Sequence, residues 1–561
     1  MKILIQDKYN TTVNLTDRDY VTEGGEGKIY SKNGMIYKLY SDKTKIIPKA
    51  KIDELKQIDR TTILAPQNLV LDSKLTPIGI TMKLVNNVEP ICKLFSNEFK
   101  KRFNIDEKNI LELIENLAKT IKFIHSKKCL IVDGNEMNYL VDNKKFKIPY
   151  FIDVDSYQTP HFPATAISPA IKDYHCKKFS PLSDWFSFGV ISVQLFLGIH
   201  PYKGTHPNYK KYELEKRMKD NASIFNNKVK LPKLVNDFSY IPKNYLDWFI
   251  KIFEKGERLL PPSIAGQIII SVPVTVIQST NLFIIELKDE MSDDIIKYKN
   301  GAIFTSSSVF ISNKTISIEP TTDILLTKQS LTPILIDIKD NKLVLKDLNL
   351  TEISTQIQAR KKTFVNDMFF ILMNDLLCEV DVEEINSKFI PLIKSTWNVL
   401  PNATKLFDGV IYQDILGIPY LMLPYKDKNG KTCCSIKAVP ELARYNILEA
   451  KHDNNVIIVI GYKHSKYTKF TFKFDEKYIN YNCRKEVDVE YHIPNFVVLD
   501  NGIAINITPE DDVEIFSVKL DKPDIKQIKD KSINFGMKLC KDGINVMFRN
   551  NNKLFKLSMN K

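Results

Sequence analysis

The chain has 561 residues, of which 43% are hydrophobic and 26% charged. This composition is typical of a globular protein with two or three domains and excludes a disordered chain. The formal net charge is +13, but the basic residues are spread along the chain among nearly as many acids, so no nucleic-acid partner is expected. No apolar run approaches the roughly 18–20 residues of a membrane span, and the chain start turns polar too early for a secretory signal. We therefore expect a cytoplasmic protein that does not contact membranes.

The eight cysteines do not indicate a metal site. They are scattered, without a C-x-x-C pair or a Cys/His cluster at the spacing of zinc ligands. Thiols that are not paired in disulfides are the expectation for such a pattern, which agrees with a cytoplasmic location.

The first strands surround a glycine-rich turn, Gly24-Gly25-Glu26-Gly27. Glycines allow the backbone N–H groups of a hairpin to approach phosphate oxygens, because no Cβ blocks the approach. Asn33-Gly34 is a hairpin signal, and it leads into the apolar strand Met35–Tyr40. Taken alone, a turn of this kind indicates phosphate binding only weakly.

Lys38 lies inside that apolar strand, where an ammonium group is costly unless it has partners. A helix follows at about residues 49–59, and it carries Glu54 and Asp53. We expect the Glu54 carboxylate, or Asp53 if the register differs by one, to hold the Lys38 ammonium while that ammonium contacts nucleotide phosphates. The alternative is a surface lysine on an edge strand.

The residues after about 105 are mainly helical, with amphipathic segments at 109–126 and 183–197. Between them, Asp133 precedes Asn138 by five residues, and a short strand follows at Tyr139–Val141. Phosphoryl transfer needs a carboxylate that orients the acceptor hydroxyl and an amide oxygen that helps to hold Mg²⁺. Asp133 and Asn138 would supply them.

A further apolar strand, from Pro149, ends in Asp153 and Asp155. Acids two residues apart on a strand share one face, and Mg²⁺ prefers one or two carboxylates together with phosphate oxygens and water. Solvated aspartates at a strand end are the alternative interpretation.

The pattern changes after about residue 275 to short β-rich runs that follow Asn, Asp and Gly turns. Turn-strand units recur at about 40- to 65-residue spacing, at residues 299–304, 408–412, 500–505 and 542–547, with less regular versions at 366–370 and 453–458. A further unit near 332–345 would shorten the largest gap. Such repeats are typical of a β-propeller, here of six or seven blades. One or two β-sandwiches would also satisfy the alternation.

The order of the N-terminal motifs resembles the protein kinase fold, an α+β domain of two lobes. More narrowly, the motifs resemble bacterial and phage kinase-like proteins of the tellurite-resistance-associated type, at residues 24–27, 133–138, 153–158, 183–189, 198–204 and 253–258. The resemblance covers about residues 18–270. It implies an N-lobe at residues 1–85 and a C-lobe at 86–275, before the β-rich domain at 280–561.

The resemblance also implies roles for individual residues. Lys38 would bind the α- and β-phosphates of ATP, Glu54 would hold Lys38, and Asp133 would orient the acceptor hydroxyl. Asn138 and Asp153 would bind Mg²⁺, with Asp155 as the alternative ligand, and Asp184 would brace the backbone of the catalytic loop. The residues implied for ATP binding are Gly24, Gly25, Gly27, Ile29, Lys38, Met82 and Leu84.

Three departures from the family pattern affect the expectations. Thr22 replaces the first loop glycine. Ile131-Val132 replaces the His-Arg before the catalytic aspartate, and because that arginine is missing, we expect no activation by loop phosphorylation. Ser168-Pro169-Ala170 lacks the glutamate that normally pairs with a late-helix arginine, whose place is taken by Leu260, close to Arg258. We therefore expect that ion pair to be absent.

The sequence thus predicts an ATP- and Mg²⁺-dependent serine/threonine protein kinase with a C-terminal domain that binds a protein partner. Two alternatives stay open. One is a catalytically inactive, nucleotide-binding scaffold, and the other is a small-molecule kinase, because such enzymes use similar Asp and Asn motifs.

Overall fold

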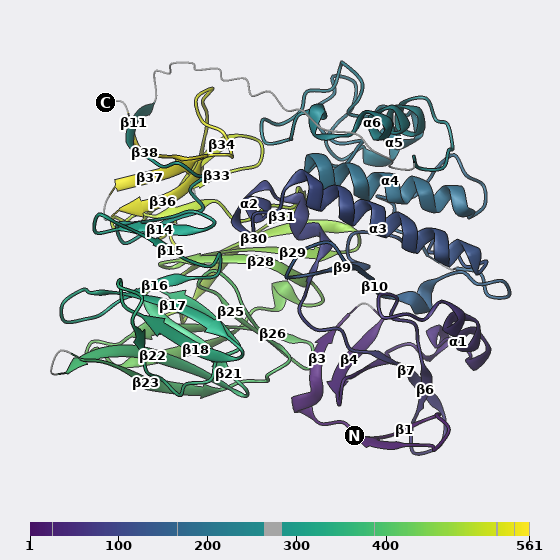
Figure 1. The fold of residues 1–561 in the computed structure, drawn as a ribbon, viewed down its shortest axis with the longest axis horizontal. Coiled ribbons are helices and arrows are strands. Elements are labelled where there is room, and N and C mark those ends of the chain that lie inside the picture. The colour runs from purple at the N-terminus through teal and green to yellow at the C-terminus, as the bar shows by residue number, and fades with distance from the viewer. Residues whose placement is uncertain are drawn as a thin grey trace. The chain divides into compact units, whose positions relative to one another are not determined.

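The computed structural model describes residues 1–24, 26–164, 166–262, 283–385, 388–522, 525–542 and 545–559. The chain divides into two compact units (Figure 1). The first unit comprises Met1–Asp19 and Glu23–Ile277, and the second comprises Tyr20–Thr22 and Gln278–Lys561. Among the described residues, no helix is long and apolar enough to cross a membrane.

The chain begins with a seven-stranded sheet in the order β2-β1-β6-β7-β5-β4-β3. Its strands are β1 (Lys2–Ile5), β2 (Thr12–Asn14), β3 (Tyr20–Glu23), β4 (Gly27–Lys32), β5 (Met35–Tyr40), β6 (Asn68–Leu71) and β7 (Pro77–Lys83). Successive side chains of β5 alternate between the faces of this sheet, so Lys38 and Tyr40 share one face. Helix α1 (Lys49–Leu55) covers that face, because its Ile52 packs in one cluster with Tyr40 and Ile80.

The rest of the first unit is mainly helical, as the sequence predicts. Its helices are α2 (Asn97–Arg102), α3 (Glu107–Ser126), α4 (Pro181–Leu197), α5 (Leu214–Lys219) and α6 (Lys243–Phe249). The long helices α3 and α4 lie side by side (Figure 1). Capping boxes at Asp106 and Ser180 begin the two helices, and Gly198, with φ of 78°, ends α4 in the left-handed conformation that favours glycine.

Helix α4 is buried along almost its whole length, and a lysine supports its last turn. Lys100 of α2 donates a hydrogen bond of 2.6 Å to the Leu195 carbonyl oxygen, and the lysine side chain is itself buried. Carbonyl groups in the last turn of a helix lack partners within the helix, so the bond satisfies one of them. Burial lowers the pKa of Lys100 to about 7.

A small antiparallel sheet has the order β10-β9-β8, and two of its strands lie between the two long helices in the sequence. It consists of β8 (Val88–Pro90), β9 (Tyr139–Asp142) and β10 (Pro149–Phe151). The segment Asp133–Asn138 leads into β9, and Asp153 follows β10. The Ile152 amide donates to the Asn138 carbonyl oxygen at 3.0 Å, so the pairing of β9 with β10 brings these two loops together.

The second unit is built almost entirely of strands. In the part of the chain that the structure describes, it forms seven four-stranded antiparallel sheets. Six of them follow the chain in order: β12 (Lys297–Lys299), β13 (Ala302–Phe304), β14 (Ser308–Ile311) and β15 (Lys314–Ser317); β16 (Asp323–Leu326), β17 (Pro333–Lys339), β18 (Lys342–Lys346) and β19 (Glu352–Ile353); β20 (Lys361–Val365), β21 (Met368–Met373), β22 (Leu376–Ile385) and β23 (Lys388–Asn398); β24 (Thr404–Leu406), β25 (Ile411–Ile415), β26 (Ile418–Lys426) and β27 (Thr432–Ala438); β28 (Asn446–Asp453), β29 (Val456–Lys463), β30 (Lys466–Phe474) and β31 (Tyr481–Val489); β32 (Phe496–Val498), β33 (Ile503–Ile507), β34 (Asp512–Ser517) and β35 (Ile525–Lys529).

The seventh sheet combines the two ends of the unit. Strand β11 (Phe283–Glu290) pairs with β38 (Lys553–Met559), and β37 (Asn545–Asn550) and β36 (Lys538–Asp542) complete the sheet. Pairing the first strand with the last one fixes the beginning of the unit to its end.

The turn-strand repeats of the sequence coincide with one feature of these sheets. Each of the six repeats falls at the connection from an edge strand of a sheet to its neighbour, and the unit near 332–345 covers β17, β18 and the turn between them. The repeats at residues 299–304, 408–412 and 500–505 place Gly301, Gly409 and Gly502 at positive φ. The predicted turns are therefore confirmed, although Gly543 and Ile544 lie outside the described residues.

Candidate active site

Lys38 is surrounded by three carboxylates. Its Nζ lies 2.8 Å from Glu26 Oε2, 2.8 Å from Asp153 Oδ1 and 2.8 Å from Asp155 Oδ2, and its side chain is only 8% exposed. The prediction that this strand lysine has charged partners is confirmed. The expectation that Asp153 and Asp155 share the face of a strand is wrong, because β10 ends at Phe151 and both acids lie in the turn after it.

The pKa values of these groups follow from burial and from their mutual charges. Burial by itself would lower the pKa of Lys38, but Asp155 and Asp153 raise it well above its ordinary value. Burial raises the pKa of Asp153, and the neighbouring Asp155 charge raises it further against the effect of Lys38. Burial opposes the ionisation of Asp155 as well, yet Lys38 and the Tyr40 hydroxyl bring its pKa below the usual value. Lys38 is therefore charged, and Asp155 is its fixed counter-ion.

Glu54 does not hold Lys38, contrary to the sequence prediction. Its Oε1 lies 2.6 Å from His161 Nδ1, and Asp53, the alternative, is exposed and pairs with Lys49 and Lys56. The physical reason is the rotation of α1. The buried face of this helix consists of Lys51, Ile52 and Leu55, which turns the acids at positions 53 and 54 aside.

Helix α1 reaches the site through a different residue, Lys51. This lysine is 6% exposed, and its Nζ donates to the Asp155 carbonyl oxygen at 2.8 Å. The Tyr40 hydroxyl donates to Asp155 Oδ2 at 2.5 Å. Asp155 is therefore held by α1 and by β5. Asp153, two residues earlier, has a left-handed backbone conformation with φ of 56°.

Asp133 and Asn138 lie together, as predicted. The Asn138 Nδ2 donates to the Asp133 carbonyl oxygen at 2.8 Å, which leaves the amide oxygen of Asn138 as the atom that can face a cation. Asp133 Oδ1 accepts a hydrogen bond of 2.8 Å from the Ser168 amide. Burial raises the pKa of Asp133, against the effect of the bond from Ser168, and the Glu26 charge raises it further. Glu26 thus acts on both Lys38 and Asp133.

The loop before Asp133 is braced by Asp184, as the resemblance implies. Asp184 Oδ2 accepts from the Ile131 amide at 2.8 Å, and Oδ1 accepts from the Val132 amide at 2.9 Å. Asp184 Oδ2 also lies 2.9 Å from Nε2 of His125, at the end of α3. Val132 has a φ of 63°, which is a strained conformation for a β-branched residue. The two bonds from Asp184 hold the backbone in this conformation.

A divalent cation fits the acidic residues of the site. One carboxylate oxygen each from Glu26, Asp153 and Asp155 lies within 4.8 Å of the others. Asp155 Oδ1 is buried and has no hydrogen-bond partner among the described residues. Carboxylate oxygens of this kind, together with the Asn138 amide oxygen, are the ligands that Mg²⁺ prefers.

The glycines implied for ATP binding differ in whether the fold leaves room for a side chain at their positions. A Cβ at Gly27 would lie 2.0 Å from the Leu39 carbonyl oxygen, so the pairing of β4 with β5 requires glycine there. A Cβ at Gly24 would meet nothing closer than 4.0 Å, and the Gly24 amide donates to the Gly27 carbonyl oxygen at 2.9 Å. Gly25 lies outside the described residues. Of the two described glycines, Gly27 is therefore required by packing and Gly24 is not.

The remaining residues implied for ATP binding lie on the strands around Lys38. Ile29 of β4 pairs directly with Lys38 and is half-buried. Met82 packs against the apolar cluster beneath α1. The Leu84 amide donates to the Gly34 carbonyl oxygen at 3.0 Å, so this amide is occupied by the chain itself.

Asp173 and Arg258 form an ion pair that the sequence does not predict. Arg258 donates to both carboxylate oxygens of Asp173, with Nε and Nη2 each at 2.5 Å. The Arg258 guanidinium holds the pKa of Asp173 below its usual range although burial raises it.

Comparisons with known proteins do not identify a family. No family model and no curated protein matches the chain. Among solved structures, the chain is similar to the autoinhibited serine kinase domain of the giant muscle protein titin, at 13% identity and a TM-score of 0.34. The match covers 46% of this chain and 77% of the titin domain. A likeness at this level says nothing about activity.

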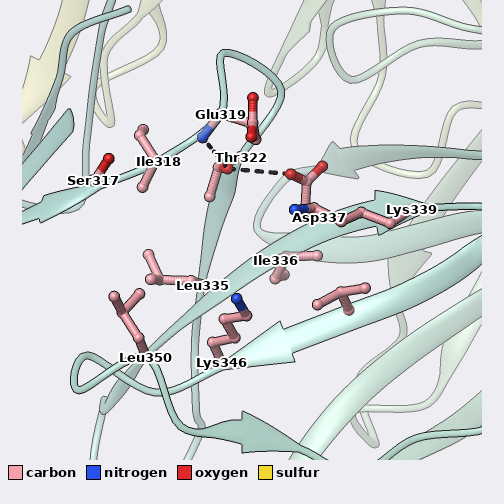
Figure 2. Close-up of a pocket in the computed structure, with 11 residues that line it drawn as sticks. Ser317, Ile318, Glu319, Thr322, Leu335, Ile336, Asp337, Lys339, Lys346 and Leu350 are labelled. Atoms are coloured by element: carbon pink, nitrogen blue, oxygen red, sulfur yellow. Dashed lines mark hydrogen bonds between the residues drawn. The ribbon is translucent and has the colours of Figure 1, made fainter. Parts of the chain in front are cut away.

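A pocket also lies on the second unit (Figure 2). It is lined by Ser317, Ile318, Glu319, Thr322, Leu335, Ile336, Asp337, Lys339, Val344, Lys346 and Leu350. Its polar groups bond to one another, since Thr322 Oγ1 accepts from the Glu319 amide at 3.2 Å and lies 3.4 Å from Asp337 Oδ2. We assign no chemistry to this pocket.

Sequence reasoning missed three residues that shape the site. Tyr40 lies two positions after Lys38, so the period of a strand could have placed both on one face. Lys51 precedes Leu55 by four residues, which is the spacing of one helical face. Glu26 is part of the glycine-rich turn, but its pairing with Lys38 has no sequence signal.

Proposed function

We propose that the chain is an ATP- and Mg²⁺-dependent serine/threonine protein kinase. The observation that carries the proposal is the buried Lys38 among carboxylates, with Glu26 acting electrostatically on both Lys38 and Asp133. A buried ammonium beside acids, near a carboxylate and an amide oxygen in one loop, is the set of groups that phosphoryl transfer requires. As a finer proposal, the protein belongs with kinase-like proteins of the tellurite-resistance-associated type and is cytoplasmic.

Each residue of the site would have its own role in phosphoryl transfer. Lys38 would contact the α- and β-phosphates once Glu26 has moved away. Asp133 would orient the acceptor hydroxyl and accept its proton, while Asp184 keeps the loop in place. Asn138 and Asp153 would hold Mg²⁺, which when bound neutralises the charge of the phosphates.

The alternative of a catalytically inactive scaffold has its own support. The Leu84 amide is bonded to Gly34, and Glu26 occupies Lys38, so two groups expected to bind ATP are engaged within the chain. A small-molecule kinase is the second alternative. No described contact distinguishes its acceptor from a protein hydroxyl.

We infer that the second unit is a seven-bladed β-propeller that binds a protein partner. Seven four-stranded antiparallel sheets support this inference, and so does the pairing of β11 with β38, because circular closure by the two ends of a domain removes exposed sheet edges. Edge strands of different sheets also contact one another, as β12 does with β36 and β32 with β36.

The test is transfer of the γ-phosphoryl group. The purified full-length protein is incubated with γ-labelled ATP and Mg²⁺, alone, with a generic protein acceptor and with small alcohols and sugars, beside an Asp133→Ala variant. Label on protein that disappears in the variant supports the kinase. Nucleotide binding without transfer supports the scaffold instead, and label only on small acceptors supports the small-molecule kinase.

A further inference from the structure

The three carboxylates around Lys38 differ in how firmly they are held. The Asp155 side chain is 4% exposed, whereas those of Asp153 and Glu26 are 34% and 45% exposed. Asp155 accepts the Tyr40 hydroxyl on Oδ2 and the Lys51 ammonium on its carbonyl oxygen. Asp155 is thus fixed by groups from the sheet and from α1, whereas the side chains of the other two acids are partly exposed.

This difference matters for a lysine that binds phosphate. A nucleotide brings several negative charges, so the acids that compete for Lys38 must leave when it binds. Glu26 and Asp153 can leave at small cost because water can solvate their charges. Removing Asp155 from Lys38 would instead leave an uncompensated charge in the interior, which is strongly unfavourable.

We propose that Asp155 is the residue that positions Lys38, and that α1 contributes to this through Lys51 rather than through a glutamate. The proposal rests on the proposed function, since it concerns the lysine that would contact ATP. It reassigns the role that the resemblance gives to Glu54, whose carboxylate is bonded to His161. It also reassigns Asp155, which the sequence suggests as a metal ligand.

Whether Asp155 positions Lys38 or binds a metal ion can be tested through its second carboxylate oxygen. Asp155 Oδ1 is buried without a hydrogen-bond partner among the described residues, so a role as metal ligand would use this atom. A residue that positions Lys38 affects nucleotide binding whether or not Mg²⁺ is present. A metal ligand affects it only when Mg²⁺ is present.

The first experiment measures ATP binding to the full-length protein by calorimetry, with Mg²⁺ and with EDTA. We expect Asp155→Asn to weaken binding by a similar factor in both conditions, roughly tenfold or more. Asp153→Asn weakens it only with Mg²⁺, and Glu54→Gln binds like the wild type. A loss in Asp155→Asn that is confined to Mg²⁺, or an equal loss in Glu54→Gln, overturns the proposal.

The second experiment does not depend on ATP, so it decides the matter even if the proposed function fails. It compares the thermal unfolding of Lys38→Met, Asp155→Asn and the double variant. We expect the double variant to melt higher than the sum of the single losses predicts, because it removes the buried charges of Lys38 and Asp155 together. A matched cycle of Lys38→Met with Glu54→Gln should be additive.

The same cycle remains informative if Asp155→Asn alone does not fold. In that case the double variant with Lys38→Met should recover a folded chain. A double variant as unstable as Asp155→Asn, additivity between Lys38 and Asp155, or coupling between Lys38 and Glu54 contradicts the proposal.

Discussion

Replacing Asp184 by asparagine removes the brace of the loop before Asp133 while keeping the shape of the side chain. Asp184 accepts the Ile131 and Val132 amides on two different oxygens. Asparagine has one oxygen, so one buried amide would face an NH₂ group. An unsatisfied buried donor costs about 1–3 kcal/mol, and loss of the charge on the remaining bond adds roughly 1 kcal/mol. We therefore expect Asp184→Asn to destabilise the loop by about 2–4 kcal/mol.

Hydrogen exchange measured by mass spectrometry gives the local effect of this change. The amides of Ile131 and Val132 are buried and bonded in the wild type, so they should exchange slowly. A loss of about 2–4 kcal/mol corresponds to exchange faster by roughly 30- to 700-fold. The matched control is Asp53→Asn, because Asp53 is an exposed aspartate on α1. Unchanged protection of residues 131–132 in Asp184→Asn, or an equal change in the control, would refute the brace.

Three other substitutions test the packing of the first unit. The pKa of Lys100 is about 7 in the folded chain and 10.5 ordinarily, so the free energy of unfolding should rise from pH 7 to 10.5. Lys100→Met should remove this rise, which melting temperatures measured across that pH range check. Gly27→Ala should lower the melting temperature because its Cβ would overlap the backbone of β5, whereas Gly24→Ala should leave it unchanged. Asp173→Asn should expose the activation segment to limited proteolysis by weakening the bidentate pair with Arg258, and an unaltered cleavage rate would argue against that role.

The hairpins of the second unit could be predicted because Asn-Gly and Asp-Gly dipeptides indicate their turns. Asn-Gly and Asp-Gly turns require positive φ, and Gly301, Gly409 and Gly502 adopt it in the structure. Each such turn joins the first two strands of a sheet. The pairing of β11 with β38 had no such signal, because it depends on contacts between residues far apart in the chain.

The motifs of the candidate site were predictable from spacing, but some of their partners were not. Asp133 and Asn138 lie in one loop, so five residues of chain bring them together. Which residue of α1 reaches the site depends on the rotation of this helix, which the burial of Ile52 and Leu55 decides. That rotation favours Lys51 over Glu54, and the family pattern gave no reason to expect it.

The central claim is that Lys38 serves phosphoryl transfer, and a single-turnover measurement tests it most directly. The rate of γ-phosphoryl transfer from ATP is compared in the wild type, in Lys38→Met and in Lys32→Met, a control lysine on β4 that pairs with Asp19. We predict equal rates for the wild type and the control, and a loss of at least about 100-fold in Lys38→Met. Transfer that persists in Lys38→Met, or no transfer by the wild type, would contradict the account.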